Sequence, residues 1–195
     1  MISVIDYGAG NTQSVINVLD ELSVKYIVTN REIDINQSEK IIFPGVGEAS
    51  YAMRKLHLLN LFTMLKVTNK PLLGICLGMQ LLCEKSIEGN SVCLGIIPPV
   101  SLKFDETKIK VPHMGWNRVS VTKESKLFEN IEKDSYFYFA NSFYVPLNDF
   151  TTAVTEHGIK FSSAVQKDNF YGVQFHPEKS GKAGTQIIKN FIELC

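Results

Sequence analysis

In the first half of the chain, short continuous apolar runs alternate with segments whose apolar residues recur at helical spacing. The runs predict strands at residues 2–6, 24–29, 40–45 and 71–75, and the spaced segments predict helices at 11–22, 50–66 and 77–86. Asn11 stands where the first of these helices needs a capping side chain at its N-terminus. Strands that alternate with helices indicate a parallel sheet with helices on both faces.

From about residue 90 the pattern changes to β-like segments that follow one another without intervening helices. They lie at residues 101–104, 116–121, 135–145, 151–158, 160–166 and 170–175, and a final helix is predicted at 184–194. No linker-like stretch or repeat divides the chain. We therefore expect a single α/β domain over residues 1–195, in which an open, mostly parallel sheet flanked by helices carries an added antiparallel portion.

The composition is that of an ordinary globular protein, with 45% hydrophobic residues and a formal net charge of zero. This balance argues against a general surface for nucleic acid or anionic membranes. No apolar run is long enough to cross a bilayer, and the start MISVIDYGAG does not resemble a signal peptide. The cysteines form no C-x-x-C pair and have no histidine at metal-ligand spacing, which predicts reduced thiols, no metal site and a cytoplasmic location.

Cys76 stands between two glycines, in the sequence PLLGICLGMQLL, where a predicted strand turns directly into a predicted helix. Gly74 and Gly78 relieve crowding at such a corner, and the G-x-C-x-G pattern is the thiol counterpart of the nucleophile elbow. The thiol would then lie above the carboxyl end of the sheet, where open α/β folds bind their ligands. An inert cysteine in a tight turn is the alternative, and we expect that role for Cys83, Cys93 and Cys195.

A cysteine nucleophile needs a base, and His176 is the best placed of the four histidines. It ends a predicted strand, and Glu178 follows two residues later, on the same side of an extended segment. A carboxylate there would hold the imidazole in the tautomer that leaves its other nitrogen free to accept a proton. A solvated turn is the alternative for this segment alone, but with Cys76 it completes a set of nucleophile, base and orienting group. The other histidines give weaker signals: His57 lies in a helix among leucines, His113 in a loop and His157 in a turn.

Two glycine-rich loops follow predicted strands. The sequence FPGVGEAS exposes backbone N–H groups, so Val46 or Gly47 would supply an oxyanion donor beside the Leu77 N–H if strands 40–45 and 71–75 are neighbours. The alternative is an ordinary turn. The loop at residues 6–11 lacks the third glycine of a dinucleotide fingerprint, because Gln13 stands there, and we expect no cofactor.

The motifs PGVGEAS, GICLGMQLL, VPHMGWN and GVQFHPEKSG, taken together, resemble those of the class I (triad) glutamine amidotransferases, and most closely the glutaminase subunits of imidazole glycerol phosphate synthase. The resemblance implies that Cys76 attacks the amide of L-glutamine, that His176 transfers the proton and that Glu178 orients His176. It also implies that Gln80 helps to bind glutamine. The ammonia would pass to a (β/α)8 cyclase partner, in a heterodimer with Trp116 and Lys179 near the interface, for histidine biosynthesis.

One segment departs from the resemblance. These subunits usually have His-Ser/Thr-Tyr in the segment that helps to place substrate glutamine, and this chain has Asn141, Ser142 and Phe143. The departure leaves open a paralogous subunit that supplies ammonia for amidination of a surface sugar. Two further alternatives are a stand-alone cysteine hydrolase and a binding subunit without catalytic activity; the complete triad counts against the second.

Overall fold

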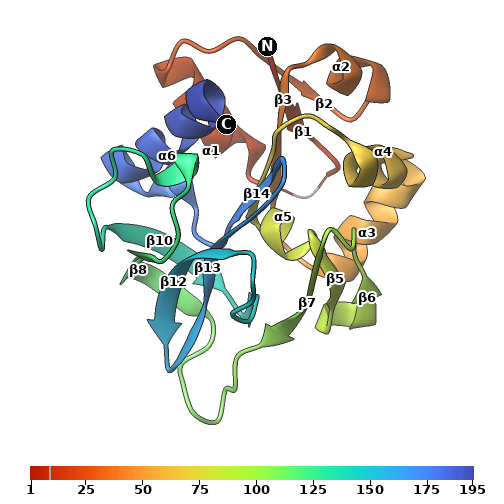
Figure 1. Cartoon of the computed structure of the whole chain (residues 1–195). Coiled ribbons are helices and arrows are strands. Elements are labelled where there is room, and N and C mark those ends of the chain that lie inside the picture. Colours follow the sequence, from red (N-terminus) through yellow and green to blue (C-terminus); the bar gives the residue numbers. More distant parts are fainter. Residues whose placement is uncertain (9) are drawn as a thin grey trace.

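The central element of this computed structural model, which describes residues 1–8 and 10–195, is an eight-stranded sheet (Figure 1). Its strands, in spatial order, are β2 (Tyr26–Thr29), β1 (Ile2–Ile5), β3 (Lys40–Gly45), β4 (Leu72–Cys76), β14 (Phe170–Val173), β13 (Ile159–Lys167), β12 (Thr151–His157) and β9 (Ser120–Val121). Neighbours are parallel from β2 to β14 and antiparallel from β14 to β9. The predicted fold class, a mostly parallel sheet with an added antiparallel portion, is therefore confirmed.

Helices cover both faces of the parallel half. On one face lie α1 (Thr12–Glu21) and α6 (Gly181–Leu194), and on the other α2 (Glu32–Gln37), α3 (Ala49–Leu58) and α4 (Leu61–Val67) (Figure 1). Each face has its own buried cluster: Leu19 and Phe191 pack with Val4, whereas Leu56 and Leu65 pack with the strands on the opposite side. Asn11 caps α1 as predicted, because its side chain accepts a hydrogen bond from the Ser14 N–H.

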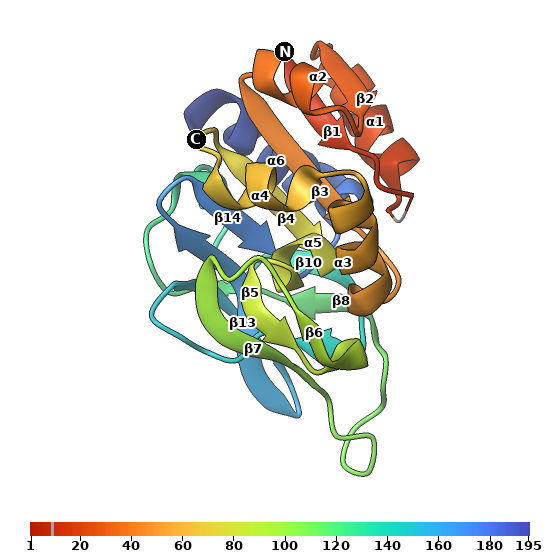
Figure 2. The same cartoon turned by 90° about the vertical axis from the view of Figure 1, so that its right-hand side faces the viewer.

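Two smaller sheets complete the molecule (Figure 2). One pairs β8 (His113–Arg118) with β10 (Tyr136–Asn141), and the other has the order β11 (Phe143–Tyr144), β7 (Ile97–Lys103), β5 (Cys83–Ser86) and β6 (Ser91–Val92). Single 3₁₀ turns lie at Glu88–Asn90, Lys126–Phe128 and Pro177–Lys179. Among the described residues, no helix has both the length and the apolar character needed to span a membrane.

Two helix predictions are wrong. The helix expected at 50–66 is divided into α3 and α4, because Asn60 adopts the left-handed conformation with φ of 58°. The helix expected at 77–86 is only α5 (Leu77–Gln80), after which Cys83 starts a strand that pairs with β7. This region is buried on every side, so its apolar residues carry no helical period that would mark the end of α5. The short helix α2 was not predicted at all.

Lys40, at the start of β3, joins the N-terminal part of the sheet to the last helix. Its Nζ donates hydrogen bonds to the carbonyl oxygens of Phe191 (3.0 Å), Ile192 (2.7 Å) and Cys195 (2.5 Å). These carbonyls lie at the C-terminus of α6, where backbone acceptors have no partner within the helix. A residue early in the chain therefore caps its final element.

Candidate active site

Cys76 occupies a strained corner between β4 and α5. Its backbone has φ of 53° and ψ of −108°, which a residue with a side chain rarely adopts. The flanking glycines make the corner possible: a Cβ on Gly78 would lie 2.0 Å from the Phe43 carbonyl oxygen, and one on Gly74 would lie 2.7 Å from backbone atoms of Gly78. The elbow predicted from the G-x-C-x-G pattern is therefore present, at the carboxyl end of a central strand.

His176 reaches the same end of the sheet from the neighbouring strand. It follows β14, which pairs in parallel with β4, and its backbone N–H donates to the Tyr138 carbonyl oxygen (2.8 Å). Its Nδ1 lies 2.8 Å from Oε1 of Glu178, and both side chains are almost completely buried. Glu178 lies in the 3₁₀ turn Pro177–Lys179, so the expected extended geometry is wrong although the expected pair forms.

Cys76 and Glu178 both raise the pKa of His176. Burial opposes a charge on the His176 imidazole, but the charge and hydrogen bonding of Cys76, and then those of Glu178, outweigh it and raise the His176 pKa to about 10. The imidazole is therefore protonated at neutral pH, beside the sulfur. By contrast, burial raises the pKa of Cys93 to about 12, and it raises the pKa of Cys83 as well, so these thiols stay protonated as expected for bystanders.

A cavity of about 190 Å³ opens beside the Cys76 thiol. All seven predicted substrate and oxyanion residues line it, together with Cys76, Ala140 and Glu88; the seven are Val46, Gly47, Leu77, Gln80, Asn141, Ser142 and Phe143. Strands β3 and β4 are neighbours, with Gly45 opposite Cys76, which brings the Val46–Gly47 loop to the cavity. The volume is below the range of about 300–1,000 Å³ typical of drug-sized ligands, so the site suits one small molecule.

Gln80 connects the cavity wall to Cys76 through Gln174. Its Nε2 donates to the Phe143 carbonyl oxygen (3.0 Å) and to Oε1 of Gln174 (3.0 Å). The Gln174 Nε2 in turn lies 3.6 Å from the sulfur of Cys76. The Gln80 amide nitrogen is thus engaged within the protein, and any contact of this side chain with a ligand would be made by its oxygen.

Sequence reasoning missed three residues of the site. Glu88 lies in the turn after β5, lines the cavity, and accepts a hydrogen bond from the Ala49 N–H (2.8 Å); burial raises its pKa. Gln174 contacts Cys76, and the Tyr7 hydroxyl is buried without a partner among the described residues. Burial and the charge of Cys76 both raise the Tyr7 pKa. Gln174 lies within the motif GVQFHPEKSG and Tyr7 within the loop 6–11, but neither pattern indicates that these side chains reach Cys76, and Glu88 belongs to no motif.

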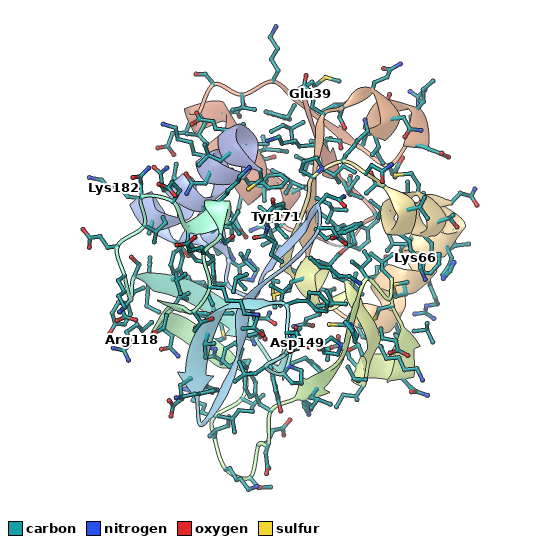
Figure 3. The ribbon with its side chains drawn as sticks, in the orientation of Figure 1. Glu39, Lys66, Arg118, Asp149, Tyr171 and Lys182 are labelled. Carbon is teal, nitrogen blue, oxygen red and sulfur yellow. The ribbon has the colours of Figure 1, made fainter. Side chains whose placement is uncertain are left out.

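The two predicted interface residues lie on one surface. Trp116, on β8, is 57% exposed, and its ring centroid lies 6.3 Å from that of Tyr138 on β10. The Nζ of Lys179 lies 6.0 Å from the centroid of the same Tyr138 ring. Arg118 ends β8 at the periphery of the molecule, whereas Tyr171 of β14 lies near its centre (Figure 3). We name the exposed surface made by Trp116, Tyr138 and Lys179 the aromatic face.

Within residues 1–8 and 10–195, no group of three or more histidine, cysteine, aspartate or glutamate side chains is arranged to hold a metal ion. The glycine loop at residues 6–11, for which we expected no cofactor, includes Ala9, which lies outside the described residues.

The sequence matches a family model and several known proteins. The family model "Glutamine amidotransferase class-I" matches residues 3–194, and the chain therefore belongs to this family. Over 195 residues, covering 99% of each chain, it is 49% identical to the Imidazole glycerol phosphate synthase subunit HisH of Bacteroides fragilis. It is 43% identical over 194 residues, again 99% of each chain, to the protein of that name from Buchnera aphidicola.

The fold also matches solved structures. A glutamine amidotransferase of known crystal structure superposes with a TM-score of 0.77 at 15% identity, covering 99% of this chain and 97% of the other. The structure of PurLQS from Thermotoga maritima matches with a TM-score of 0.70 at 18% identity, covering 98% of this chain and 96% of the other. At these identities the likeness shows the fold alone.

Proposed function

We propose that the chain is the glutaminase subunit of a two-protein imidazole glycerol phosphate synthase, which hydrolyses L-glutamine to glutamate and ammonia in histidine biosynthesis. A (β/α)8 cyclase subunit receives the ammonia and uses it to make imidazole glycerol phosphate and aminoimidazole carboxamide ribotide. The observation that carries the proposal is the elbow thiol of Cys76, which raises the pKa of His176 in the His176–Glu178 pair, at a cavity of about 190 Å³. Relatives named for this synthase, 43–49% identical over the whole chain, support the choice of acceptor.

The reaction runs through a covalent intermediate. The Cys76 sulfur attacks the side-chain amide carbon of glutamine, and the imidazolium of His176 gives its proton to the nitrogen, which leaves as ammonia. Water then loses a proton to the neutral His176 and attacks the γ-glutamyl thioester, which releases glutamate and restores the sulfur. Glu178 keeps Nδ1 of His176 engaged, so the other ring nitrogen serves both proton transfers. Leu77 and the Val46–Gly47 loop line the cavity, and we expect their backbone N–H groups to bind the oxyanion.

The lining of the cavity suits free glutamine rather than a peptide. Glu88 supplies a carboxylate at the cavity, which would pair with the α-ammonium group that a free amino acid has and a peptide lacks. Asn141, Ser142 and Phe143 form the opposite stretch of lining in spite of their departure from the usual His-Ser/Thr-Tyr. A stand-alone peptide or ester hydrolase has no comparable support.

The aromatic face is the proposed docking surface for the cyclase. Trp116 is exposed, and aromatic residues are the usual anchors of protein interfaces. Lys179 directly follows Glu178 and would lie between the partner and the catalytic group. Strands β1 and β14, from the first and the last parts of the sequence, belong to the same sheet, and we propose that residues 1–195 act as one domain in the cytoplasm.

The test is co-purification with the cyclase of the same organism, followed by measurement of glutamate release with and without that partner. We expect the cyclase to stimulate glutamate release. We also expect Cys76→Ala to abolish glutamine-dependent synthesis and to spare synthesis from added ammonium. A chain that the cyclase does not stimulate, but that a sugar-amidating partner does, would refute the histidine role. Loss of both activities in Cys76→Ala would refute the separate role of the nucleophile.

A further inference from the structure

Two buried polar atoms face each other between β8 and β10, and the reaction described above uses neither. His113 and Asn141 are directly opposite in the antiparallel register, and their side chains are 4% and 5% exposed. Opposite residues of an antiparallel pair point to the same side, close enough for their side chains to interact. Nδ1 of His113 and Oδ1 of Asn141 are both buried and have no hydrogen-bond partner among the described residues, although the Asn141 side chain acts on the His113 pKa. Buried polar atoms are nearly always paired, so we expect these two atoms to form a hydrogen bond with each other.

The neighbours of His113 fix its tautomer. Asn117 Nδ2 lies 3.0 Å from Nε2 of His113, and the orientation of this amide is defined, because its Oδ1 accepts from the Arg118 N–H (2.7 Å). An amide nitrogen only donates, so Nε2 must accept and the proton must lie on Nδ1. Burial, and then the stacked ring of His157, lower the pKa of His113 to about 4, so the ring is neutral near pH 7. A neutral ring protonated on Nδ1 is the donor that Asn141 Oδ1 lacks.

The other end of the Asn141 amide contacts the cavity wall. Its Nδ2 donates to the Phe143 carbonyl oxygen (2.9 Å), the same atom that accepts from Gln80 Nε2 (3.0 Å). Gln80 Nε2 also donates to Oε1 of Gln174, and the Gln174 Nε2 lies 3.6 Å from the Cys76 sulfur. One set of polar contacts therefore leads from Asn141 of β10 to the Cys76 sulfur, and Asn141 and Phe143 within it line the cavity.

We propose that His113 is a positioning residue for glutamine: its Nδ1–H holds the Asn141 amide, which in turn holds the Phe143 carbonyl at the wall of the substrate cavity. This inference rests on the proposed glutaminase function. His113 does not line the cavity, so it acts through Asn141. Removal of the Nδ1–H donor of His113 should weaken glutamine binding without affecting the proton transfer between Cys76 and His176.

The competing explanation is that His113 only fills space. Its ring lies in an aromatic cluster, with centroid distances of 4.7 Å to Phe139, 5.9 Å to Phe161 and 6.3 Å to Phe104. His113→Phe separates the two explanations, because phenylalanine keeps the packing and removes the donor. His113→Asn is the rescue variant, since its amide nitrogen can take the place of Nδ1. His57→Phe is the control, because His57 is exposed and also stacks on a phenylalanine ring, at 4.5 Å.

The experiment measures glutaminase kinetics of the full chain in complex with the cyclase. For His113→Phe we expect kcat/KM for glutamine to fall about tenfold, mainly through a higher KM, which matches one buried acceptor left unpaired. His113→Asn should recover to within about threefold of the parent, and His57→Phe and ammonium-dependent synthesis should not change. Adding His113→Phe to Asn141→Leu should cost nothing further, because both changes remove the same contact.

A parental KM in a well-folded His113→Phe, or additive effects in the double variant, would overturn the proposal. Should His113→Phe fail to fold, ¹⁵N NMR of the parent decides instead, because a proton on Nε2 of His113 contradicts the proposal and a proton on Nδ1 supports it. Neither the NMR measurement nor a calorimetric measurement of glutamine binding requires catalytic turnover. A parent that releases no glutamate with the cyclase would therefore defeat the proposed function and still leave this inference testable.

Discussion

The Glu178→Gln substitution removes one charge from the buried His176–Glu178 pair and preserves its shape. Glutamine keeps an acceptor oxygen for Nδ1 of His176, which lies 2.8 Å from Oε1 in the parent, so the ring keeps its orientation. The loss is the carboxylate charge, next to an imidazole whose side chain is only 4% exposed. The substitution therefore tests what the charge contributes, separately from the hydrogen bond.

Breaking a buried ion pair by removing one charge costs about 3–5 kcal/mol. Part of that interaction is already present before the reaction, because the raised pKa of His176 keeps the imidazole protonated in the free enzyme. Only the part of the ion-pair energy that is gained during the reaction affects the rate of the chemical step. Since ~1.4 kcal/mol corresponds to tenfold in rate, we expect kcat for glutamate release to fall by between about tenfold and 10³-fold.

The pKa of His176 gives a second, independent readout. Burial lowers it, whereas Cys76, and to a smaller extent Glu178, raise it to a net value of about 10. Glu178→Gln should therefore lower the His176 pKa, and Cys76→Ala should lower it further. An NMR titration of the imidazole signals in the parent and both variants measures this order directly.

Two outcomes would refute this reasoning. One is a Glu178→Gln variant with the parental kcat, assayed with the cyclase present and with ammonium-dependent synthesis as the control for an intact complex. The other is a His176 pKa that falls more in Glu178→Gln than in Cys76→Ala. That result would make Glu178, rather than the sulfur, the main cause of the raised pKa.

Three further substitutions test other parts of the molecule. Glu88→Gln should raise the KM for glutamine about tenfold or more at nearly constant kcat, because it removes the charge expected to pair with the α-ammonium group; an unchanged KM in steady-state assays would exclude that contact. Trp116→Ala should weaken cyclase binding about tenfold or more by calorimetry, without changing the unfolding temperature of the isolated chain. Lys40→Met leaves carbonyls of α6 unpaired and should lower the free energy of unfolding by about 1–3 kcal/mol. The thermal midpoint of unfolding should therefore fall by about 2–12 °C. An unchanged midpoint would show that water replaces the lysine.

The elbow was predictable because its cause is local. A Cβ at position 74 would lie 2.7 Å from backbone atoms of Gly78, only four residues along the chain, and Cys76 has a positive φ, so the glycine spacing indicates the geometry. The alternation of strands and helices predicts parallel strands but not which strands are neighbours; the pairing of β3 with β4, which brings Val46 and Gly47 to the thiol, was a condition that the structure meets. Patterns that arise from short-range sterics can be interpreted from one sequence.

The errors have a different origin. The apolar residues after Cys76 are buried on all sides, so they carry no period that separates α5 from the strand starting at Cys83. Glu88, Gln174 and Tyr7 reach the site from three separate elements, and each becomes part of it only through tertiary packing. The His176–Glu178 pair was predicted for the wrong reason, since a 3₁₀ turn rather than an extended segment brings the carboxylate to Nδ1.

Strand β8 gives a physical reason to expect the activity to depend on a partner. Its side chains alternate, with Met114, Trp116 and Arg118 exposed and His113 and Asn117 turned inward. The outward set adjoins the proposed cyclase surface, whereas the inward set leads to the cavity wall through the proposed contact of His113 with Asn141. Because one strand carries both sets, a shift of β8 when the cyclase docks would move the two together. A glutaminase built in this way needs no separate regulatory domain to sense its partner.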